Sequence, residues 1–474
     1  MPATRILATL GPASWDRASI DSLARAGVTA FRLNFSHGIH EVLARVIADV
    51  RAVEAELGWP LALLGDLAGP KMRTCDVAGG GSIMLGVGDE VVITAEDAET
   101  TPGRIAVACP GLPAALDPGD KVLFDDGKLE VEVLESSRGE ARGLVIFGGP
   151  LSSKKGVNLP GGRVDIPSIT EKDEADLAFA IEHGVDWIAL SFVQETRDVV
   201  DLKRRIAVAG ARIPVIAKIE RPLAVEDLDA ILEVTDGIMV ARGDLGVELG
   251  PETLPVVQKE MILSARRRSR LVITATQMLE SMTHEPRPTR AEASDVANAL
   301  FDGTDVVMLS GETAVGDHPV RVVETMRAIC EDAEKSDLYH GKMASLLRPD
   351  EGGVAHAAIR AACAAAEEVE ARAIAVFTAT GWTALAASAW RPRVPIYAIT
   401  PEDRAWRRLA LAWGVEPVRI TGKAASPDAL HRQGIEVLLE TYRLMAGDIV
   451  VLLSGSVLDG HGANTVRILR VGNQ

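Results

Sequence analysis

The sequence has the length and composition of a large, acidic globular protein. It contains 474 residues, of which 47% are hydrophobic and 25% charged, and its formal net charge is −17. The length predicts roughly three domains, and the charge argues against partners that need a basic face, such as nucleic acid or an anionic membrane surface. No apolar run approaches the ~18 residues of a membrane span, and the N-terminus lacks the apolar core of a signal peptide. We therefore expect a cytoplasmic protein with no nucleic-acid or membrane partner.

The first part of the chain alternates short apolar runs with helical patterns. Strands are predicted at residues 5–9, 29–33 and 61–65, with helices at about 16–26 and 40–57. Residues 71–163 are different, because they are rich in glycine and alternate apolar with polar residues. Within them, Asp125, Asp126 and Gly127 form a hairpin-turn signal. We predict a small β domain, resembling a barrel, inserted at residues 71–163 after the third strand.

The alternation of strands and helices resumes after this insert. A helix is predicted at about 171–183, with Thr170 as its N-cap. Further strands are predicted at residues 187–191, 215–219, 237–241, 271–275 and 305–309, which makes eight outside the insert. This pattern indicates a (β/α)₈ TIM barrel over residues 1–70 and 164–340, with its active site at the carboxyl ends of the strands. A doubly wound sheet is the alternative, but the expected glycine-rich first turn is missing.

A second α/β unit is predicted at the end of the chain, over residues 350–474. Charged residues, Pro349 and a Gly352–Gly353 pair predict a linker at 336–353. An alanine-rich helix is predicted at about 354–369. Strands are predicted at residues 373–377, 396–399, 415–420, 449–453 and 465–471.

The stretch from Pro214 to Glu248 carries the densest chemical signal. Two apolar runs, each typical of a buried strand, lead into charged residues: Lys218 and Glu220 in one, Arg242 and Asp244 in the other. Parallel neighbouring strands would bring an ammonium and two carboxylates to one rim. Two hard oxygen ligands suit Mg²⁺ or Mn²⁺, and the lysine suits an anionic substrate such as a phosphate. A simple salt bridge between Lys218 and Glu220 is the structural alternative.

Seven segments, in order, resemble the motifs of the pyruvate kinase family. They are FRLNFSHG (31–38), KGVNLPG (155–161), AKIE (217–220), ARGDLG (241–246), ATQMLESM (275–282), PTRAE (288–292) and MLSGET (308–313). The resemblance covers nearly the whole chain. It implies a barrel with a mobile lid inserted after the third strand, a C-terminal α/β domain and a homotetramer.

The resemblance also implies an activity and its residues. Family members transfer the phosphoryl group of phosphoenolpyruvate to ADP, giving ATP and pyruvate in the last step of glycolysis. By resemblance, Arg32 and Lys218 bind the phosphoryl oxygens and Thr276 assists protonation of the methylene carbon. Thr276 could equally serve as a helix N-cap. A purely structural role is also open for Ser191 and Glu248, and no catalytic role is assigned to His37.

Ligand positions follow from the same resemblance. Glu220 and Asp244 are implied to hold the divalent ion, and the backbone N–H groups of Gly243 and Asp244 to bind the substrate carboxylate. Arg73 and Lys155 are implied to meet the nucleotide phosphates, Lys155 from the lid.

One motif departs from the K⁺-dependent members of the family. Asn34, Ser36, Asp66 and Leu67 fall on their monovalent-cation positions, but the segment from Asp66 reads DLAGPK, with Lys71 in place of a glutamate. A lysine here changes the local charge and can supply an ammonium in place of the ion. The sequence therefore resembles the K⁺-independent branch, and we expect a requirement for Mg²⁺ or Mn²⁺ but not for K⁺. The alternative is that Lys71 points to solvent and K⁺ still binds.

A regulatory site is predicted in the C-terminal domain. The loop after residue 377 offers Thr378, Thr380, Gly381 and Thr383 before a helix, a typical phosphate cradle. In the family this loop binds phosphorylated effectors, with residues 454–462 as the opposite wall. A sugar phosphate or AMP would be the effector, and an ordinary βα turn is the alternative.

Two other functional classes remain open from the sequence. One is another metal-dependent barrel enzyme that acts on phosphoenolpyruvate or a 2-oxo acid, such as a carbon–carbon lyase. It would not need a nucleotide lid, so the insert with Lys155 argues against it. The other is an inactive sensor or scaffold, against which the intact set of predicted catalytic residues argues.

Overall fold

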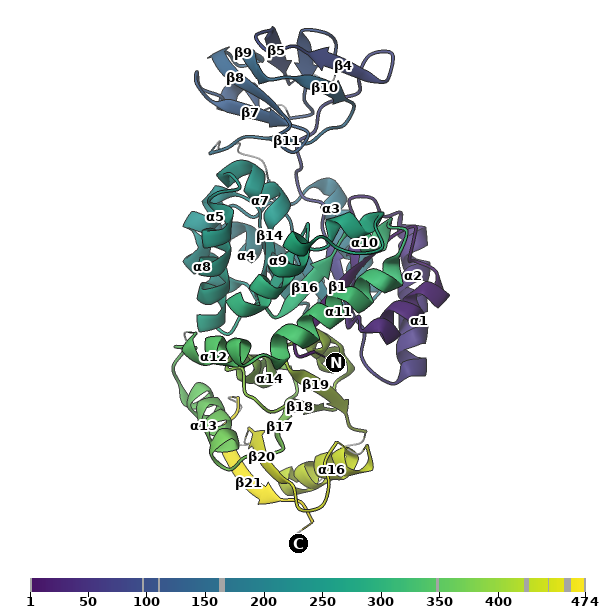
Figure 1. The fold of residues 1–474 in the computed structure, drawn as a ribbon, viewed down its shortest axis with the longest axis vertical. Coiled ribbons are helices and arrows are strands. Elements are labelled where there is room, and N and C mark those ends of the chain that lie inside the picture. The colour runs from purple at the N-terminus through teal and green to yellow at the C-terminus, as the bar shows by residue number, and fades with distance from the viewer. Residues whose placement is uncertain are drawn as a thin grey trace.

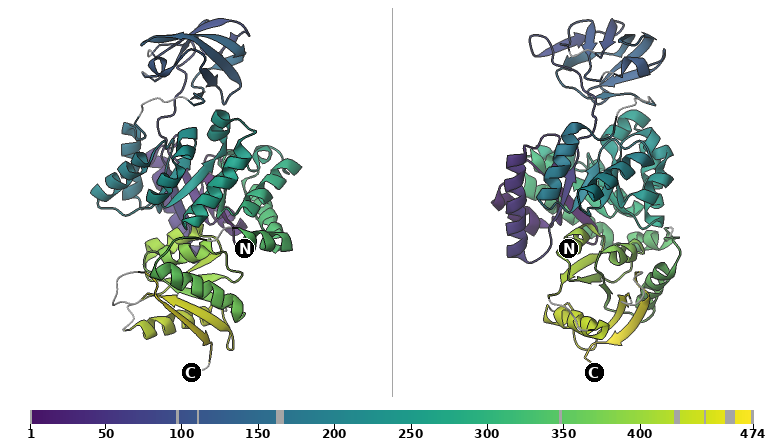
Figure 2. Two further views of the ribbon diagram at one scale, coloured as in Figure 1. Left: turned by 90° about the vertical axis from the view of Figure 1, so that its left-hand side faces the viewer. Right: turned by 180° about the vertical axis from the view of Figure 1, so that it is seen from behind.

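Three bodies are stacked along the long axis of the molecule. The computed structural model describes residues 2–95, 98–109, 111–161, 167–346, 349–421, 426–441, 443–455 and 462–472. The β insert lies at one end, the barrel in the middle and the C-terminal α/β body at the other end (Figure 1). Figure 2 shows the same order from two other sides, with the N-terminus near the junction of the barrel and the C-terminal body. None of the helices in the described segments combines the length and hydrophobicity that a membrane span requires.

The central body is a closed barrel of eight parallel strands, which confirms the predicted fold. Around the barrel the strand order is β1-β16-β15-β14-β13-β12-β3-β2. The strands are β1 (Arg5–Leu10), β2 (Ala30–Asn34), β3 (Ala62–Asp66), β12 (Trp187–Leu190), β13 (Val215–Ile219), β14 (Gly237–Ala241), β15 (Leu271–Ala275) and β16 (Val306–Leu309). The helices around them are α1 (Arg17–Ala26), α2 (His40–Leu57), α3 (Glu171–Glu182), α4 (Thr196–Val208), α5 (Pro222–Glu226), α6 (Leu228–Val234), α7 (Arg242–Leu249), α8 (Leu254–Arg267), α9 (Arg290–Asp302), α10 (Gly311–Ala314) and α11 (Pro319–Lys335).

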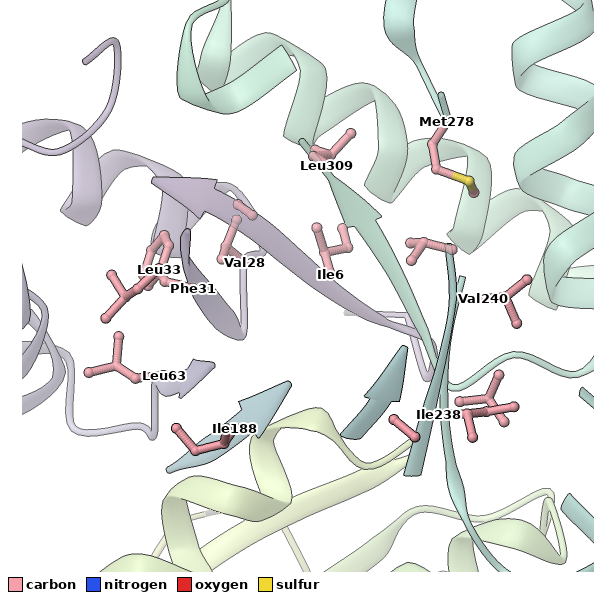
Figure 3. Packing of buried hydrophobic residues seen from close by; sticks show 14 of the residues in the cluster. Ile6, Val28, Phe31, Leu33, Leu63, Ile188, Ile238, Val240, Met278 and Leu309 are labelled. Atoms are coloured by element: carbon pink, nitrogen blue, oxygen red, sulfur yellow. The ribbon is translucent and has the colours of Figure 1, made fainter. Parts of the chain in front are cut away.

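The strands are continuous apolar runs because both of their faces are buried. Alternate side chains point to opposite faces of a strand, so Ile6 packs with the helices while Leu7 packs inside the barrel. Figure 3 shows members of the outer cluster, among them Ile6, Phe31 and Val240, carried by separate strands around the barrel. Helix ends are fixed locally, as at α3, where Thr170 and Asp173 form the predicted capping box.

The insert is a separate β body with its own apolar core. It contains a six-stranded sheet in the order β11-β7-β8-β9-β5-β6 and a two-stranded sheet of β10 and β4. The strands are β4 (Ser82–Leu85), β5 (Glu90–Thr94), β6 (Arg104–Ala106), β7 (Lys121–Phe124), β8 (Leu129–Ser136), β9 (Glu140–Phe147), β10 (Gly149–Ser152) and β11 (Val157–Asn158). Asp125 and Asp126 adopt φ values of +51° and +56° in the turn between β7 and β8, as the hairpin signal predicted.

The C-terminal body is a five-stranded sheet with helices. Its order is β19-β18-β17-β20-β21, and only β21 runs antiparallel to its neighbour among these strands. The elements are α13 (Val354–Glu368), β17 (Ala373–Phe377), α14 (Trp382–Ala389), β18 (Ile396–Thr400), α15 (Asp403–Arg408), β19 (Val415–Arg419), α16 (Pro427–Glu440), β20 (Ile449–Ser454) and β21 (Thr465–Arg470).

The predicted linker at 336–353 is wrong in its first half, which forms helix α12 (Asp337–Ser345). Ser336 caps this helix by accepting a hydrogen bond from the Tyr339 N–H at 3.1 Å. Tyr339 and Met343 are buried in the same apolar cluster as the barrel helices. A polar composition therefore concealed a short helix that is held in place by two buried side chains.

The C-terminal body also closes the amino end of the barrel. Ala410 and Leu411 are buried in one cluster with Leu7, Leu64 and Ile273 from the barrel strands. The Trp187 indole N–H donates to the carbonyl oxygen of Arg408 at 3.3 Å. The barrel interior is thus completed at its amino end by residues from another body, while the predicted site lies at the opposite, carboxyl end.

Candidate active site

Lys218 lies at the centre of a buried ionic network at the carboxyl end of the barrel. Its side chain projects from β13, and its Nζ lies 3.0 Å from Glu220 Oε1 and 3.4 Å from Asp66 Oδ1. The same Nζ donates to Ser191 Oγ at 2.7 Å. The sequence placed Lys218 and Glu220 together, and the barrel adds Asp66 from β3 and Ser191 from the end of β12. The result is an ammonium fixed by three groups, which come from the ends of three strands.

Arg32 is the second cation of this rim and reaches it from β2. Its Nε donates to Asp66 Oδ2 at 2.6 Å, and its Nη1 donates to Thr9 Oγ1 at 3.2 Å. The side chain keeps 13% of its surface exposed, whereas Asp66 is almost fully buried. Asp66 therefore joins both cations, and the remaining guanidinium N–H groups are available to an anion. Thr9 carries no sequence signal, because a single threonine in a buried strand is ordinary.

The electrostatics of the network favour the charged form of both partners. Burial alone would lower the pKa of Lys218, but the charges of Asp66 and Glu220 outweigh it and raise that pKa. Burial would likewise raise the pKa of Asp66, but Lys218 and Arg32 outweigh it and hold that pKa below its usual value. Lys218 is therefore an ammonium at neutral pH, suited to binding an anionic substrate but not to acting as a base.

Glu220 and Asp244 fit a divalent ion. Burial, followed by the charge of Asp244, raises the pKa of Glu220, so these carboxylates repel each other and would be stabilised by a cation. The Phe192 N–H donates to Glu220 Oε2 at 2.7 Å and orients this carboxylate. In the described segments no group of three or more acidic, His or Cys side chains forms a cage. Two carboxylates without a full cage suit Mg²⁺, which completes its shell with waters and substrate phosphates.

Gly243 and Thr276 are brought together, but in an unexpected relation. Thr276 follows β15 with a φ of +67°, and its Oγ1 accepts a hydrogen bond from the Gly243 N–H at 2.9 Å. Gly243 is the second residue of α7, so the hydroxyl of Thr276 caps a helix from another part of the chain. Thr276 does cap a helix, which was the structural alternative for this residue. The helix that it caps is α7, however, and not one that follows Thr276 in the chain. A ligand carboxylate at Gly243 would have to share or displace this bond.

Arg242 supports this corner of the site. Its guanidinium donates to the carbonyl oxygens of Ala275 and Thr276 at 3.2 and 2.7 Å and pairs with Asp295 at 2.6 Å. It thereby ties the start of α7 to the left-handed turn that carries Thr276. The sequence identified Arg242 as a charged strand end but did not predict this bracing role, which depends on the tertiary pairing of β14 with β15.

The four predicted monovalent-cation positions converge at the ends of β2 and β3, where Asn34 is in register with Asp66. Asn34 Oδ1 accepts from the Ser36 N–H at 3.1 Å, and the Leu67 carbonyl accepts from Ser191 Oγ at 2.7 Å. Lys71 was expected beside Asp66. Instead, its Nζ lies 2.9 Å from Asp244 Oδ1 and 5.9 Å from the Phe192 ring centroid.

The charge of Lys71 is nevertheless felt near these positions. Burial, followed by the charges of Arg73, Arg32, Lys172 and Lys71, lowers the pKa of His37. The loop after β2 therefore lies in a positive field to which Lys71 contributes. The prediction for Lys71 is therefore corrected in one respect: the direct partner of its ammonium is Asp244, a predicted ligand of the divalent ion.

The lid residues Arg73 and Lys155 are held within the insert in this structure. Arg73 Nη1 donates to the Lys154 carbonyl at 3.0 Å, and Lys155 Nζ pairs with Asp125 Oδ1 at 2.8 Å. The bond from Lys155 lowers the pKa of Asp125. Arg73 forms an antiparallel bridge with Gly156, next to Lys155, so both cations lie on one part of the insert, close to where the chain enters it.

Glu248 is a direct contact between the barrel and the lid. The Asn158 side-chain amide, on β11, donates to Glu248 Oε1 at 3.4 Å. Burial raises the pKa of Glu248 to about 7, with smaller contributions from Asp244 and Glu220, against the opposing charge of Arg221. The sequence left a structural role open for Glu248, and the structure places it where α7 of the barrel meets β11 of the insert.

The predicted effector loop precedes α14. The Gly381 N–H donates to Thr378 Oγ1 at 2.9 Å, and the Trp382 N–H lies 3.4 Å from Thr380 Oγ1. Thr383 is buried, so its side chain faces the domain interior. A Cβ on Gly462 would lie 3.8 Å from Trp382, which brings the end of the predicted opposite wall beside this loop. Residues 456–461 of that wall lie outside the described residues.

The site combines a buried ammonium, a partly exposed guanidinium and two carboxylates that suit a divalent ion, and the inserted β domain adds further cations. Positioning an anionic phosphoryl group and neutralising its charge is what phosphoryl transfer requires. Fold and site together define a barrel phosphotransferase.

Comparison with known proteins gives the family. The model of the pyruvate kinase barrel domain matches residues 1–323, and that of the pyruvate kinase alpha/beta domain matches residues 356–469. The chain is 43% identical over 457 residues to pyruvate kinase 2 of Synechocystis, covering 96% of this chain and 76% of that protein. It is 40% identical over 477 residues to a Staphylococcus epidermidis pyruvate kinase, covering 100% and 81%. A crystal structure of a Cryptosporidium parvum pyruvate kinase superposes with a TM-score of 0.92 at 35% identity, covering 99% and 96%. The chain belongs to the pyruvate kinase family and is a phosphotransferase.

Proposed function

We propose that the protein transfers the phosphoryl group of phosphoenolpyruvate to ADP, giving ATP and pyruvate, with Mg²⁺ or Mn²⁺ and without a requirement for K⁺. The observation that carries the proposal is the buried Lys218 ammonium, held by Asp66, Glu220 and Ser191 beside Arg32. A protein rarely buries this charge without a purpose, because the desolvation of a lone ammonium is unfavourable. Here the ammonium and the guanidinium form a positive surface for a phosphoryl group.

The chemical step breaks the bond between phosphorus and the enol oxygen and forms a bond to the β-phosphate oxygen of ADP. Lys218 and Arg32 bind the phosphoryl oxygens and stabilise the charge that is spread over them in the transition state. A divalent ion held by Glu220 and Asp244 would supply charge neutralisation at the phosphoryl group and at the enolate oxygen. The enolate left behind is then protonated on its methylene carbon to give pyruvate.

Thr276 is the group we assign to this protonation, through an intervening water. Its hydroxyl is held between the Gly243 N–H and the Ala275 carbonyl, at 2.9 and 2.6 Å. This geometry supports a positioning role, because a hydroxyl fixed at both ends can orient a water but does not itself carry a labile proton at neutral pH. The backbone of Gly243 and Asp244, at the start of α7, would bind the substrate carboxylate.

The independence from K⁺ rests on Lys71. Its ammonium lies at the rim and contributes to the positive field around the loop of Asn34 and Ser36. The ion pair with Asp244 means that Lys71 would have to leave this carboxylate when the divalent ion binds. The freed ammonium would then be available beside Asp66 and Leu67 as the internal cation.

The remaining assignments concern the larger assembly. Arg73 and Lys155 would bind the nucleotide phosphates when the lid closes and excludes water. The loop of Thr378, Thr380, Gly381 and Thr383 would bind a sugar phosphate or AMP as an allosteric effector.

We further propose a cytoplasmic homotetramer and domain limits at 1–70 with 164–340, 71–163 and 350–474. The separate apolar cores of the insert and of the C-terminal sheet support these limits.

The test is pyruvate formation from phosphoenolpyruvate and ADP with Mg²⁺, in buffers that contain only K⁺ or only tetramethylammonium. Equal rates are the expected outcome. A rate that depends on K⁺ would keep the reaction but contradict the role of Lys71. A folded protein that is inactive in both buffers, with effectors supplied, would favour the lyase or scaffold alternatives.

A further inference from the structure

A cluster of arginines lies at the junction of the barrel and the C-terminal body, away from the active site. Arg266 at the end of α8 and Arg391 after α14 are both buried, with 3% and 7% of their surface exposed. Arg360 on α13 and Arg393 are exposed, and they line the same cavity of about 140 Å³ together with His340 of α12. Glu367 is the one acidic residue in the lining of this cavity, among the residues that the structure describes. The cavity therefore has a positive floor and a positive rim.

Among the described residues, Arg266 forms no ion pair with a carboxylate, although the charge of Asp305 acts favourably on it. Its Nη2 donates weakly to the Ala389 carbonyl at 3.3 Å, and its Nε and Nη1 have no hydrogen-bond partner within the described residues. The hydrogen bonds of Asp305 go to other groups, since Oδ1 pairs with Arg391 Nη2 and Oδ2 accepts from the Val272 N–H, both at 2.7 Å. Burial, followed by the charge of Arg391, lowers the pKa of Arg266 to about 9.

The backbone around Arg266 leaves room for its guanidinium. Gly303 adopts a φ of +98°, and a Cβ at this position would lie only 2.6 Å from Arg266 Nη1. Arg391 is fixed on the other side, since its guanidinium stacks 4.5 Å from the Trp413 ring centroid and donates to the Gly303 carbonyl at 2.7 Å. The buried side of the cavity is thus a built structure, in which Arg391 is fixed through both of its terminal nitrogens and Arg266 has two nitrogens, Nε and Nη1, without a partner among the described residues.

We propose that this cavity binds the phosphate group of a small molecule or inorganic phosphate, at a site distinct from both the active site and the effector loop. Planar guanidinium groups match the oxygens of phosphate and bind them through paired hydrogen bonds. A volume of about 140 Å³ corresponds to roughly four or five water molecules in the liquid, enough for a phosphate group and little more. The effector loop lies at the other end of α14, about 12 Å away along an eight-residue helix.

Cys363 gives a local readout, because its half-buried thiol lines the same cavity. The experiment measures the alkylation rate of Cys363 in the full-length protein with iodoacetamide, by peptide mass spectrometry. Inorganic phosphate, glycerol 3-phosphate and chloride are compared at equal ionic strength. At ten times the dissociation constant, either phosphate should slow alkylation of Cys363 about tenfold, since only the free site reacts. Cys75, half-buried in the insert near Arg73, is followed in parallel, and its protection should not change in the Arg266→Met variant.

Arg266→Met is the informative variant, and Arg268→Met is its matched control. Arg268 lies two residues further on but pairs with Asp229 and Glu233 outside the cavity. Arg266→Met should abolish the protection of Cys363 by phosphate. It should also raise the Tm of the ligand-free protein, because it removes a buried charge that has no ion-pair partner among the described residues. Arg360→Gln at the rim should weaken protection without affecting folding.

The two phosphate probes distinguish the source of the ligand. Tighter protection by glycerol 3-phosphate assigns the site to organic phosphates, and tighter protection by inorganic phosphate assigns it to the free ion. Protection by chloride alone, no protection by either phosphate, or equal protection in the wild type and in Arg266→Met would each overturn the proposal.

Discussion

Replacing Glu248 by glutamine should stabilise the metal-free protein, and the gain should grow with pH. Glu248 is 8% exposed where α7 meets β11 of the insert, and its pKa is raised from 4.5 to about 7 by burial. A carboxyl group whose folded-state pKa exceeds its unfolded-state pKa binds more protons when folded. Its ionisation therefore reduces stability as pH rises from 4.5, and the loss is complete above pH 7.

The expected magnitude follows from the shift. A pKa difference of about 2.5, at about 1.4 kcal/mol per pH unit, gives roughly 3.5 kcal/mol of lost stability above pH 7 and about 1.4 kcal/mol near pH 5.5. Glutamine has nearly the same shape, retains a hydrogen bond to Asn158 and does not ionise. The gain in Tm from Glu248→Gln should therefore be several degrees at pH 8 and clearly smaller at pH 5.5.

The assay is thermal unfolding with a chelator present, because a divalent ion would offset the charges of Asp244 and Glu220. Glu260→Gln, at an exposed position on α8, is the control and should leave the Tm unchanged at both pH values. An equal gain in Tm at both pH values, or a lower Tm of Glu248→Gln at pH 8, would refute the assignment of a buried, ionising carboxyl group at the contact of α7 with β11.

Three further substitutions test the site and the barrel. Lys218→Met should abolish phosphoryl transfer in an activity assay. The variant should still fold, as measured by circular dichroism, and still bind Mn²⁺, as measured by electron paramagnetic resonance. Near-normal turnover would mean that the site is misassigned. Lys71→Gln removes the cation 2.9 Å from Asp244 and should tighten Mn²⁺ binding about two- to fivefold in the absence of substrate, measured by electron paramagnetic resonance, whereas Lys154→Gln should not. Unchanged Mn²⁺ affinity would show that this ion pair does not compete with the metal. Leu411→Ala should destabilise the barrel by about 2–5 kcal/mol in urea unfolding, and a loss below about 1 kcal/mol would show that the barrel end closes without it.

The barrel was predictable because its strands are uniform apolar runs buried on both faces. Lys218 and Glu220 lie two residues apart, and Asp244 follows the next strand in the first turn of α7, so their convergence at one rim followed from topology alone. The helix at Asp337–Ser345 was missed because only two of its side chains are buried, too few to produce a clear periodicity.

Contacts between distant segments were beyond the reach of the sequence. Lys71 and Asp244 are 173 positions apart, and the pair depends on the path of the chain where it enters the lid. The hydrogen bond from Gly243 to Thr276 requires the left-handed turn after β15, for which a threonine is an unusual residue. Arg266 resembles any basic residue at a helix end until the surrounding elements are seen to bury it without an acidic partner.

Ala410 and Leu411 of the C-terminal body, which complete the barrel interior, constrain how such a chain can evolve. The insert has a core of its own, so an ancestor could gain, lose or exchange it without redesigning the barrel. The C-terminal body also has cores of its own, but it additionally provides side chains that fill the barrel interior around Leu7 and Ile273. A gene shortened to the barrel would encode an uncovered apolar opening, prone to aggregation. The barrel and the C-terminal body therefore share part of one core, whereas the insert packs around a core that is separate from the barrel.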